Sequence, residues 1–227
     1  MDAGEPSGRP KTADAGGAVR APTRGSTQED EIMMPKAAEM SLMGTIRERT
    51  SVRAYTAQKL DAEIVRDLLA AAVRAPTAMH AEPWAFVVVQ DSEQMKRLSD
   101  RSKRYFLDEL RQAELDRDGR VRDEFARPEF NLFYNAGTLI LVCGPSASPL
   151  MLPDCWLAAE NLMLAACARG LGTCVIGSAA TGLNRPESKA ELDIPADYSV
   201  VAPIIVGFPD GETEPTPRKA ARVLAWH

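Results

Sequence analysis

Residues 49–53 read RTSVR, and residues 75–86, about one amphipathic helix further along the chain, read APTAMHAEPWAF. The first stretch places two guanidinium groups and two hydroxyls within five residues. Arginine makes bidentate contacts with phosphate and hydroxyls add short hydrogen bonds, so this donor set suits a phosphate group. The second stretch breaks a helix at Pro76, passes through small polar residues and enters an apolar strand. A helix-to-strand corner of this kind can lie against a flat ligand.

The composition is typical of a soluble globular protein. The chain has 227 residues, of which 45% are hydrophobic and 26% are charged, which is enough for one domain with a substantial core. The net charge is −5 and no stripe of lysine and arginine stands out, so nucleic acid is not expected as a partner. No apolar run approaches the length of a membrane span, and the N-terminus lacks the apolar core of a signal peptide.

The cysteines show no C-x-x-C spacing and stand inside apolar segments, where free cysteine behaves as a small buried hydrophobe. Neither a disulfide framework nor a zinc site is therefore predicted, and a reducing cytoplasm is the expected compartment. The four positions are Cys143, Cys155, Cys167 and Cys174.

Residues 1–40 are predicted to be a disordered N-terminal segment, and residues 41–227 are predicted to form one folded domain. Val19 is the only large aliphatic residue before Ile32, so the first part of the chain cannot bury enough apolar surface to offset its ordering entropy. A transit peptide is the alternative, but such peptides are poor in acidic residues. The segment contains Asp2, Glu5, Asp14, Glu29 and Asp30. A later translation start stays open at Met33, Met34 or Met40.

Helical periodicity is clearest after Asp61, which can cap a helix that Pro76 stops. A second helix, over residues 154–169, is apolar almost all round and ends at Gly170. Such a helix must be covered on every side, and in a domain of this size a second subunit is expected to be part of the cover. Further helices are predicted over residues 41–48, 92–104 and 186–192, and an exposed helix with a loop over residues 108–130.

Strands are predicted where β-branched residues run without alternation, a pattern that indicates burial on both faces. These strands alternate irregularly with the helices around an apolar sheet, so the fold class is α/β or α+β. The predicted strands cover residues 85–89, 138–143, 173–176 and 200–206.

Together, residues 49–53 and 75–86 resemble the opening of the nitroreductase family, which binds flavin mononucleotide (FMN). The family pattern reads roughly R-R-S-x-R-x-F and then A-P-S-x-x-N-x-Q-P-W-x-F. His80 and Glu82 stand where the family usually has asparagine and glutamine. The resemblance runs from about Ser41 to Arg218. It implies a central mixed, mostly antiparallel sheet flanked by helices, in a homodimer.

The resemblance also implies contacts with the flavin. Arg49 and Arg53 would contact its phosphate and ribityl chain, with Thr50 and Ser51 between them. Residues 76–78 match the stretch that lines the isoalloxazine ring.

Within that second stretch the individual residues are Pro76, Thr77 and Ala78. His80 is expected to hydrogen-bond a flavin carbonyl or a ribityl oxygen. Glu82 is expected either to pair with an arginine or to cap the start of the strand.

A third segment matches the family after residue 154. Residues 154–166 are similar to its dimer-core helix, and a G-L-G turn at residues 170–172 leads into a strand. These glycines follow a helix and precede a strand, the reverse of a dinucleotide-binding motif. In the family, the backbone at the position of Gly177 and Ser178 lies over the flavin near its reactive N5, and Ile176 precedes them.

A fourth segment lies near the C-terminus. The match to the family's last strand and the link after it implies that Arg218 is a third phosphate-binding cation, with Lys219 a weaker candidate. Both arginine segments also have an ordinary interpretation. Residues 49–53 can form a solvated turn whose arginines pair with carboxylates, and residues 215–219 can form a proline-stiffened tail.

The activity that the resemblance implies is a two-step exchange. NADH or NADPH gives a hydride to the flavin and leaves, and an electron-poor acceptor such as a nitroaromatic compound or a quinone then takes the reducing equivalents. No catalytic side chain and no metal site are predicted, because the flavin carries the chemistry. Two alternatives stay open. One is specialised family chemistry, namely reductive dehalogenation, flavin fragmentation or reduction of an enal or semialdehyde; the other is a flavin-binding module without turnover.

Overall fold

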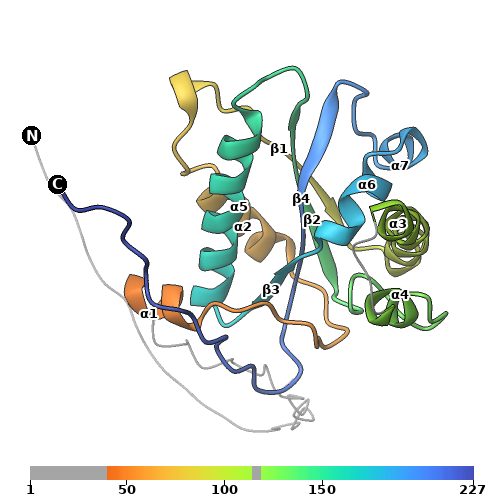
Figure 1. Ribbon diagram of the computed structural model, residues 1–227, viewed down its shortest axis with the longest axis horizontal. Helices are drawn as coiled ribbons and strands as arrows, with labels where there is room; N and C mark the ends of the chain where they lie inside the picture. Colours follow the sequence, from red (N-terminus) through yellow and green to blue (C-terminus); the bar gives the residue numbers. More distant parts are fainter. Residues whose placement is uncertain (1–39, 114–118) are drawn as a thin grey trace, which may run out of the picture. The chain divides into compact units, whose positions relative to one another are not determined.

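The computed structural model describes residues 40–113 and 119–227. Figure 1 shows a sheet with helices on both faces. Apart from Met40, the predicted disordered segment lies outside the described residues, so its interpretation stays a prediction.

Within the described residues, the sheet has four strands in the order β1-β2-β4-β3, and every pairing between them is antiparallel. The predicted α+β class with a mostly antiparallel central sheet is therefore confirmed. The strands are β1 (Ala85–Val89), β2 (Thr138–Pro145), β3 (Gly172–Val175) and β4 (Tyr198–Gly207).

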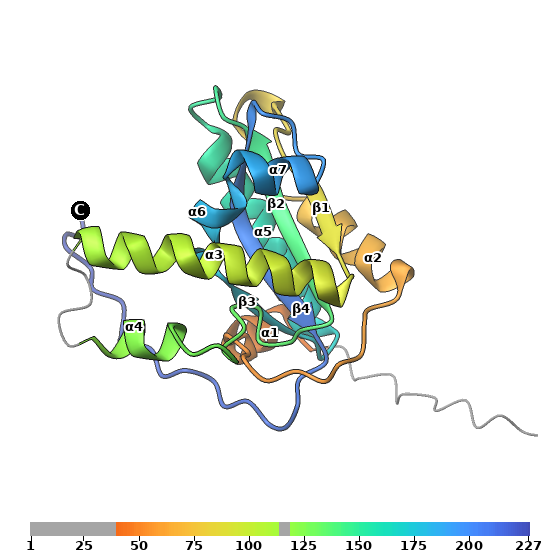
Figure 2. The same ribbon diagram turned by 90° about the vertical axis from the view of Figure 1, so that its right-hand side faces the viewer.

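One face of the sheet is covered by α2 (Ala62–Ala72) and α5 (Met151–Ala168), and the opposite face by α3 (Ser92–Ala113). Figure 2 shows α3 in front of the sheet, together with the shorter helices of that layer. The remaining elements are α1 (Leu42–Glu48), α4 (Arg120–Phe125), α6 (Ala180–Leu183), α7 (Pro186–Glu191) and the 3₁₀ turns η1 (Ala78–His80) and η2 (Gly177–Ala179).

Strand β2 shows why the sequence lacks alternation in this region. Leu139 and Leu141 pack in the core on the α3 side, whereas Ile140 and Val142 pack in the core on the α5 side. Successive side chains of a strand point to opposite faces, so covering both faces requires an uninterrupted apolar run.

Strand β1 has the predicted bounds, but the prediction that it is a buried strand was wrong. Only Val89 is buried, and Val88 is exposed. The reason is its place in the sheet, since β1 is an edge strand with a neighbour on one side only.

Two helix ends also differ from the sequence prediction. Asp61 stands at the N-cap of α2, yet its side chain makes no capping hydrogen bond. At the start of α3, by contrast, Asp91 Oδ1 accepts the Gln94 N–H at 2.7 Å and so caps the helix. Helix α3 continues to Ala113 instead of ending at Arg104, and Leu110 in this extra part is buried.

All four cysteines are free, and Cys143, Cys155 and Cys174 are buried. Burial raises the pKa of the Cys143 thiol to about 12 and that of Cys155 to about 11. The thiolate is the reactive form, so a raised pKa lowers the reactive fraction at neutral pH.

We expect an alkylating reagent at neutral pH to label Cys143 and Cys155 only after unfolding, as measured by peptide mass spectrometry. Rapid labelling of either thiol in the native protein would contradict this burial.

Within the described residues, no helix is both long and apolar enough to cross a membrane.

Candidate functional site

The segment at residues 49–53 lies against β3. Helix α1 ends at Glu48, and the chain then extends so that Ser51 forms a parallel bridge with Thr173. The Val52 N–H donates to the Thr173 carbonyl at 2.9 Å. Gly172 permits this approach, because a Cβ at that position would stand 2.8 Å from the Val52 side chain. Two motifs that are distant in the sequence are therefore neighbours.

A small cavity of about 150 Å³ brings four of the predicted residues together at the end of β3. They are Arg53, Ile176, Gly177 and Ser178. A Cβ built at Gly177 would meet no atom within 4 Å, so the backbone there is open to a flat group. The other lining residues are Phe125, Leu132, Tyr134, Cys174 and Val175.

Burial and the Arg53 guanidinium act in opposite directions on the titratable groups of this cavity. Burial raises the pKa of the Tyr134 phenol, and nearby Arg53 partly opposes the rise. The pKa of the Cys174 thiol is raised for the same reason and is opposed by Arg53 and by a hydrogen bond from Ser51. Both groups are therefore neutral at physiological pH, and the cavity keeps the positive charge of its arginine.

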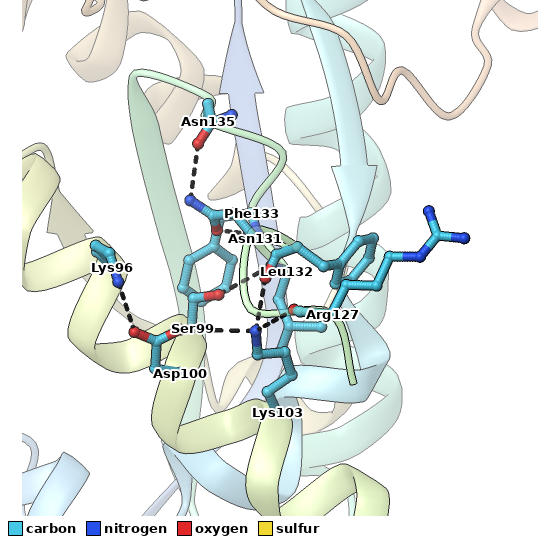
Figure 3. Close-up of polar contacts among 10 residues, drawn as sticks. Lys96, Ser99, Asp100, Lys103, Arg127, Asn131, Leu132, Phe133 and Asn135 are labelled. Atoms are coloured by element: carbon cyan, nitrogen blue, oxygen red, sulfur yellow. Dashed lines mark hydrogen bonds and ion pairs between the residues drawn. The ribbon is translucent and has the colours of Figure 1, made fainter. Parts of the chain in front are cut away.

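The loop that supplies Leu132 and Tyr134 is fastened to α3 (Figure 3). Lys103 Nζ donates to the carbonyls of Phe130 at 2.8 Å and Arg127 at 3.2 Å. The Leu132 N–H donates to Ser99 Oγ at 2.9 Å. These hydrogen bonds fix the backbone of the loop to α3, so this wall of the cavity is held in place.

Sequence reasoning missed Phe125 and Tyr134 as site residues, because they stand in or beside a highly charged stretch that suggested an exposed surface. The signal that could have found them is a cluster of aromatic residues in that stretch. The ring centroids of Phe125 and Phe130 are 4.7 Å apart, and those of Phe130 and Tyr134 are 5.7 Å apart. Tyr134 also has a φ of 48°, which is uncommon for a residue with a side chain.

A second cavity, of about 220 Å³, lies beside Arg49 and Thr50 near the start of β3. Thr50 Oγ1 lies 3.0 Å from Thr216 Oγ1, and this contact brings the C-terminal segment to residues 49–53. Arg218 follows two positions later and is exposed. Figure 1 shows this segment in dark blue, passing α1. The segment that carries Arg218 therefore passes beside residues 49–53, and the role of Arg218 at a phosphate stays a prediction.

The three predicted cations differ in their partners. Arg49 Nε lies 3.7 Å from Glu160 Oε1 on α5, so the ordinary interpretation, an ion pair, holds for this residue. Among residues 40–113 and 119–227, neither Arg53 nor Arg218 has an ion-pair partner. Both guanidinium groups are consequently available to an anionic ligand.

Residues 76–80 lie elsewhere in the chain. The Ala78 N–H donates to Asp154 in the first turn of α5, whereas Arg49 lines a cavity with Cys167 in the last turn. Cys167 follows Asp154 by thirteen positions on the helix, a rise of about 20 Å. Figure 1 shows the two segments at opposite ends of α5. The lining of the Arg53 cavity likewise contains none of Pro76, Thr77, Ala78 and His80.

This turn presents its side chains to the outside. Met79 is 91% exposed, and His80 is exposed beside it. Glu82 donates its N–H to Thr77 Oγ1 at 3.4 Å, and its carboxylate has no ion-pair partner among the described residues. The predicted cover of α5 is also incomplete in one chain, since Trp156 is 44% and Leu157 46% exposed.

A larger cavity of about 380 Å³ lies between the first turns of α3 and residues 128–137. Its lining contains none of the residues predicted for the flavin site. Two of its charged groups already bind each other, since Lys96 Nζ lies 2.8 Å from Asp100 Oδ2 (Figure 3). Size alone therefore does not identify the site.

The antiparallel sheet between two helical layers, with a cavity at the end of β3, is similar to the fold of solved nitroreductase structures. The solved structure of a nitroreductase with bound FMN from Bacteroides fragilis matches with a TM-score of 0.71 at 27% sequence identity, covering 83% of this chain and 100% of that one. The chain belongs to the nitroreductase family, whose sequence model matches residues 46–208.

Two curated relatives show the range of the family. A protein of Archaeoglobus fulgidus named NADH dehydrogenase/NAD(P)H nitroreductase is 27% identical over 171 residues, which are 73% of this chain and 84% of its own. An iodotyrosine deiodinase of Thermotoga neapolitana is 27% identical over 179 residues, 76% of this chain and 90% of its own. The family is thus shared by proteins with different named reactions.

Proposed function

We propose that the protein is an FMN-dependent oxidoreductase, which takes reducing equivalents from NADH or NADPH and passes them to an electron-poor acceptor such as a nitroaromatic compound or a quinone. The observation that carries this proposal is the cavity in which Arg53 meets Ile176, Gly177 and Ser178. The structural relative with bound FMN and the relative named as an NAD(P)H nitroreductase support the cofactor and the co-substrate.

The residues of the site fit FMN. Arg49, Arg53 and Arg218 supply cations for a phosphate, and charge-assisted hydrogen bonds offset the loss of its hydration. The backbone at Gly177 is free of any nearby atom on the side where a Cβ would stand, so a flat ring can approach it.

When bound, FMN supplies the hydride chemistry, and the protein supplies binding and orientation. The arginines would hold the phosphate, and the backbone of Gly177 and Ser178 would face the ring. The apolar side chains of Phe125 and Leu132, which line the same cavity, would limit the access of water to it. Tyr134 is a neutral phenol that lines the cavity beside Arg53.

We infer a homodimer in which each flavin site draws on both chains. The turn at residues 76–80 contacts the first turn of α5, whereas the cavity of Arg49 lies at its last turn, about 20 Å away, and the cavity of Arg53 is lined by none of residues 76–80. Two-fold pairing across α5 would cover Trp156 and Leu157 and bring the turn of one chain to the cavity of its partner. The free cysteines support a reducing compartment, and we propose the cytoplasm.

Reductive dehalogenation is the second candidate, because one relative is named iodotyrosine deiodinase. His80 and Glu82 depart from the usual family residues in the turn assigned to the flavin, which concerns the acceptor more than the flavin itself. A flavin-binding protein without turnover is the third candidate, and the same experiment separates the three.

The test starts from purified protein under nitrogen. We expect a yellow protein that releases FMN on heating, loses its colour with NADH or NADPH and regains it with a quinone or a nitroaromatic compound. Recovery with an iodinated phenol, together with iodide release, would favour dehalogenation. A colour that no reduced nicotinamide removes would identify a binding protein, and a colourless protein that ignores added FMN would refute the cofactor.

A further inference from the structure

Asp154 is a buried carboxylate in the first turn of α5, with only 4% of the residue exposed. Both of its oxygens accept the same donor, the Ala78 N–H, at 3.2 and 3.3 Å. No other hydrogen bond or ion pair reaches this carboxylate from the described part of the chain. A buried charge with a single donor is costly, even near the positive end of a helix dipole, so its presence requires a reason beyond packing.

The donor belongs to a strained turn. Met79 and His80 each have a φ of 54°, and Glu82 has a φ of 42°. Residues with side chains persist in this left-handed region only when the surrounding structure holds them there. The other hydrogen bonds of the turn are local, for example the Ala81 N–H to the Ala78 carbonyl at 3.0 Å. The bond to Asp154 instead connects the turn to a helix 76 residues away in the sequence.

We propose that Asp154 is a positioning residue for the flavin. It holds the Ala78 amide and thereby keeps residues 76–80 in the shape that binds the ring. This inference rests on the proposed function, because it assigns the turn to the flavin site. Helix α5 also carries Trp156 and Leu157 of the proposed interface. The hydrogen bond from Ala78 to Asp154 therefore connects the turn to the same helix that forms the interface.

The test compares Asp154→Asn with Asp154→Leu, two replacements of similar size. Asparagine keeps an oxygen that can accept the Ala78 N–H, and leucine does not. We expect Asp154→Leu to weaken FMN binding by the apoprotein by about tenfold, with a visible spectrum closer to that of free FMN, and Asp154→Asn to stay within about threefold of wild type. Asp67→Leu is the control, because Asp67 is an exposed carboxylate on α2 that pairs with Arg169 and not with the turn.

A second measurement needs no flavin. Hydrogen–deuterium exchange of the apoprotein should be faster in peptides covering residues 76–83 of Asp154→Leu, and unchanged in β2 and β4. The exchange measurement separates the role of Asp154 from the proposed function. If the wild-type protein binds no FMN, the proposed function is refuted, but the exchange rates still show whether Asp154 holds the turn.

Three results would overturn the role of Asp154. They are wild-type FMN affinity in Asp154→Leu, an equal loss in Asp154→Asn, or faster exchange throughout the domain. Should Asp154→Leu fail to fold, Asp154→Ala replaces it in the same comparison. If neither Asp154→Leu nor Asp154→Ala folds while Asp154→Asn does, Asp154 stabilises the whole domain and not the turn in particular. That result would also overturn the proposal.

Discussion

Replacing Leu157 with glutamate should turn the protein into a monomer that has lost its flavin. Leu157 is 46% exposed in the single chain and lies on the helix that the proposed dimer buries. Two-fold symmetry places two carboxylates in one apolar interface, and each buried, unpaired charge costs several kcal/mol. The dimer dissociation constant should therefore rise by at least about a hundredfold. Light scattering and the ratio of flavin to protein absorbance measure both effects in one experiment.

Val121→Glu is the matched control for this variant. Val121 is also a partly exposed aliphatic residue, at 39%, but it lies on α4, on the other side of the sheet from α5. We expect this variant to remain a dimer with bound flavin. A Leu157→Glu protein that stays dimeric and yellow would show that the interface lies elsewhere.

Removing the phosphate cations one at a time should weaken FMN binding by about tenfold or more for each of Arg49→Ala, Arg53→Ala and Arg218→Ala. The largest loss is expected for Arg53, because it lines the cavity and has no ion-pair partner among the described residues. Arg49 already lies 3.7 Å from Glu160, so its loss removes a weaker contribution. Flavin fluorescence during titration of the apoprotein gives the dissociation constants.

Lys219→Ala is the control for charge alone, since it removes one positive charge next to Arg218. The FMN affinity of Lys219→Ala should differ from that of the wild type by less than the affinity of any arginine variant does. This small difference from the wild type should shrink further at high salt, where long-range attraction is screened. Equal and negligible effects at all three arginines would contradict the assignment of the phosphate site.

Local patterns in the sequence determined most of the secondary structure. Helix α2 follows from apolar residues at helical spacing, and β2 follows from an apolar run of β-branched and aliphatic residues. Both signals depend on neighbours within a few positions, so no knowledge of the chain path is needed. The turn at Gly170 and the strand after it could be predicted for the same reason.

The arginine motif was also visible in the sequence, because it resembles a family pattern, and this resemblance predicts flavin contacts for residues 49–53, 76–80 and 176–178. The sequence could not show how one chain distributes these segments. Hydrogen bonding to β3 places Arg53 beside Gly177, whereas the length of α5 places Ala78 about 20 Å from Arg49. That separation is the structural argument for a site shared between two chains.

The sequence by itself thus determined the family, the order of the elements and the residue types that suit a flavin phosphate. Only the tertiary structure decided that β1 is an edge strand, that Tyr134 lines the cavity of Arg53, and that Asp154 holds the Ala78 amide. The physical reason is that periodicity reports which side of an element is apolar, but not which element covers it. A hydrogen bond across 76 residues depends on the whole path of the chain, and no local pattern contains it.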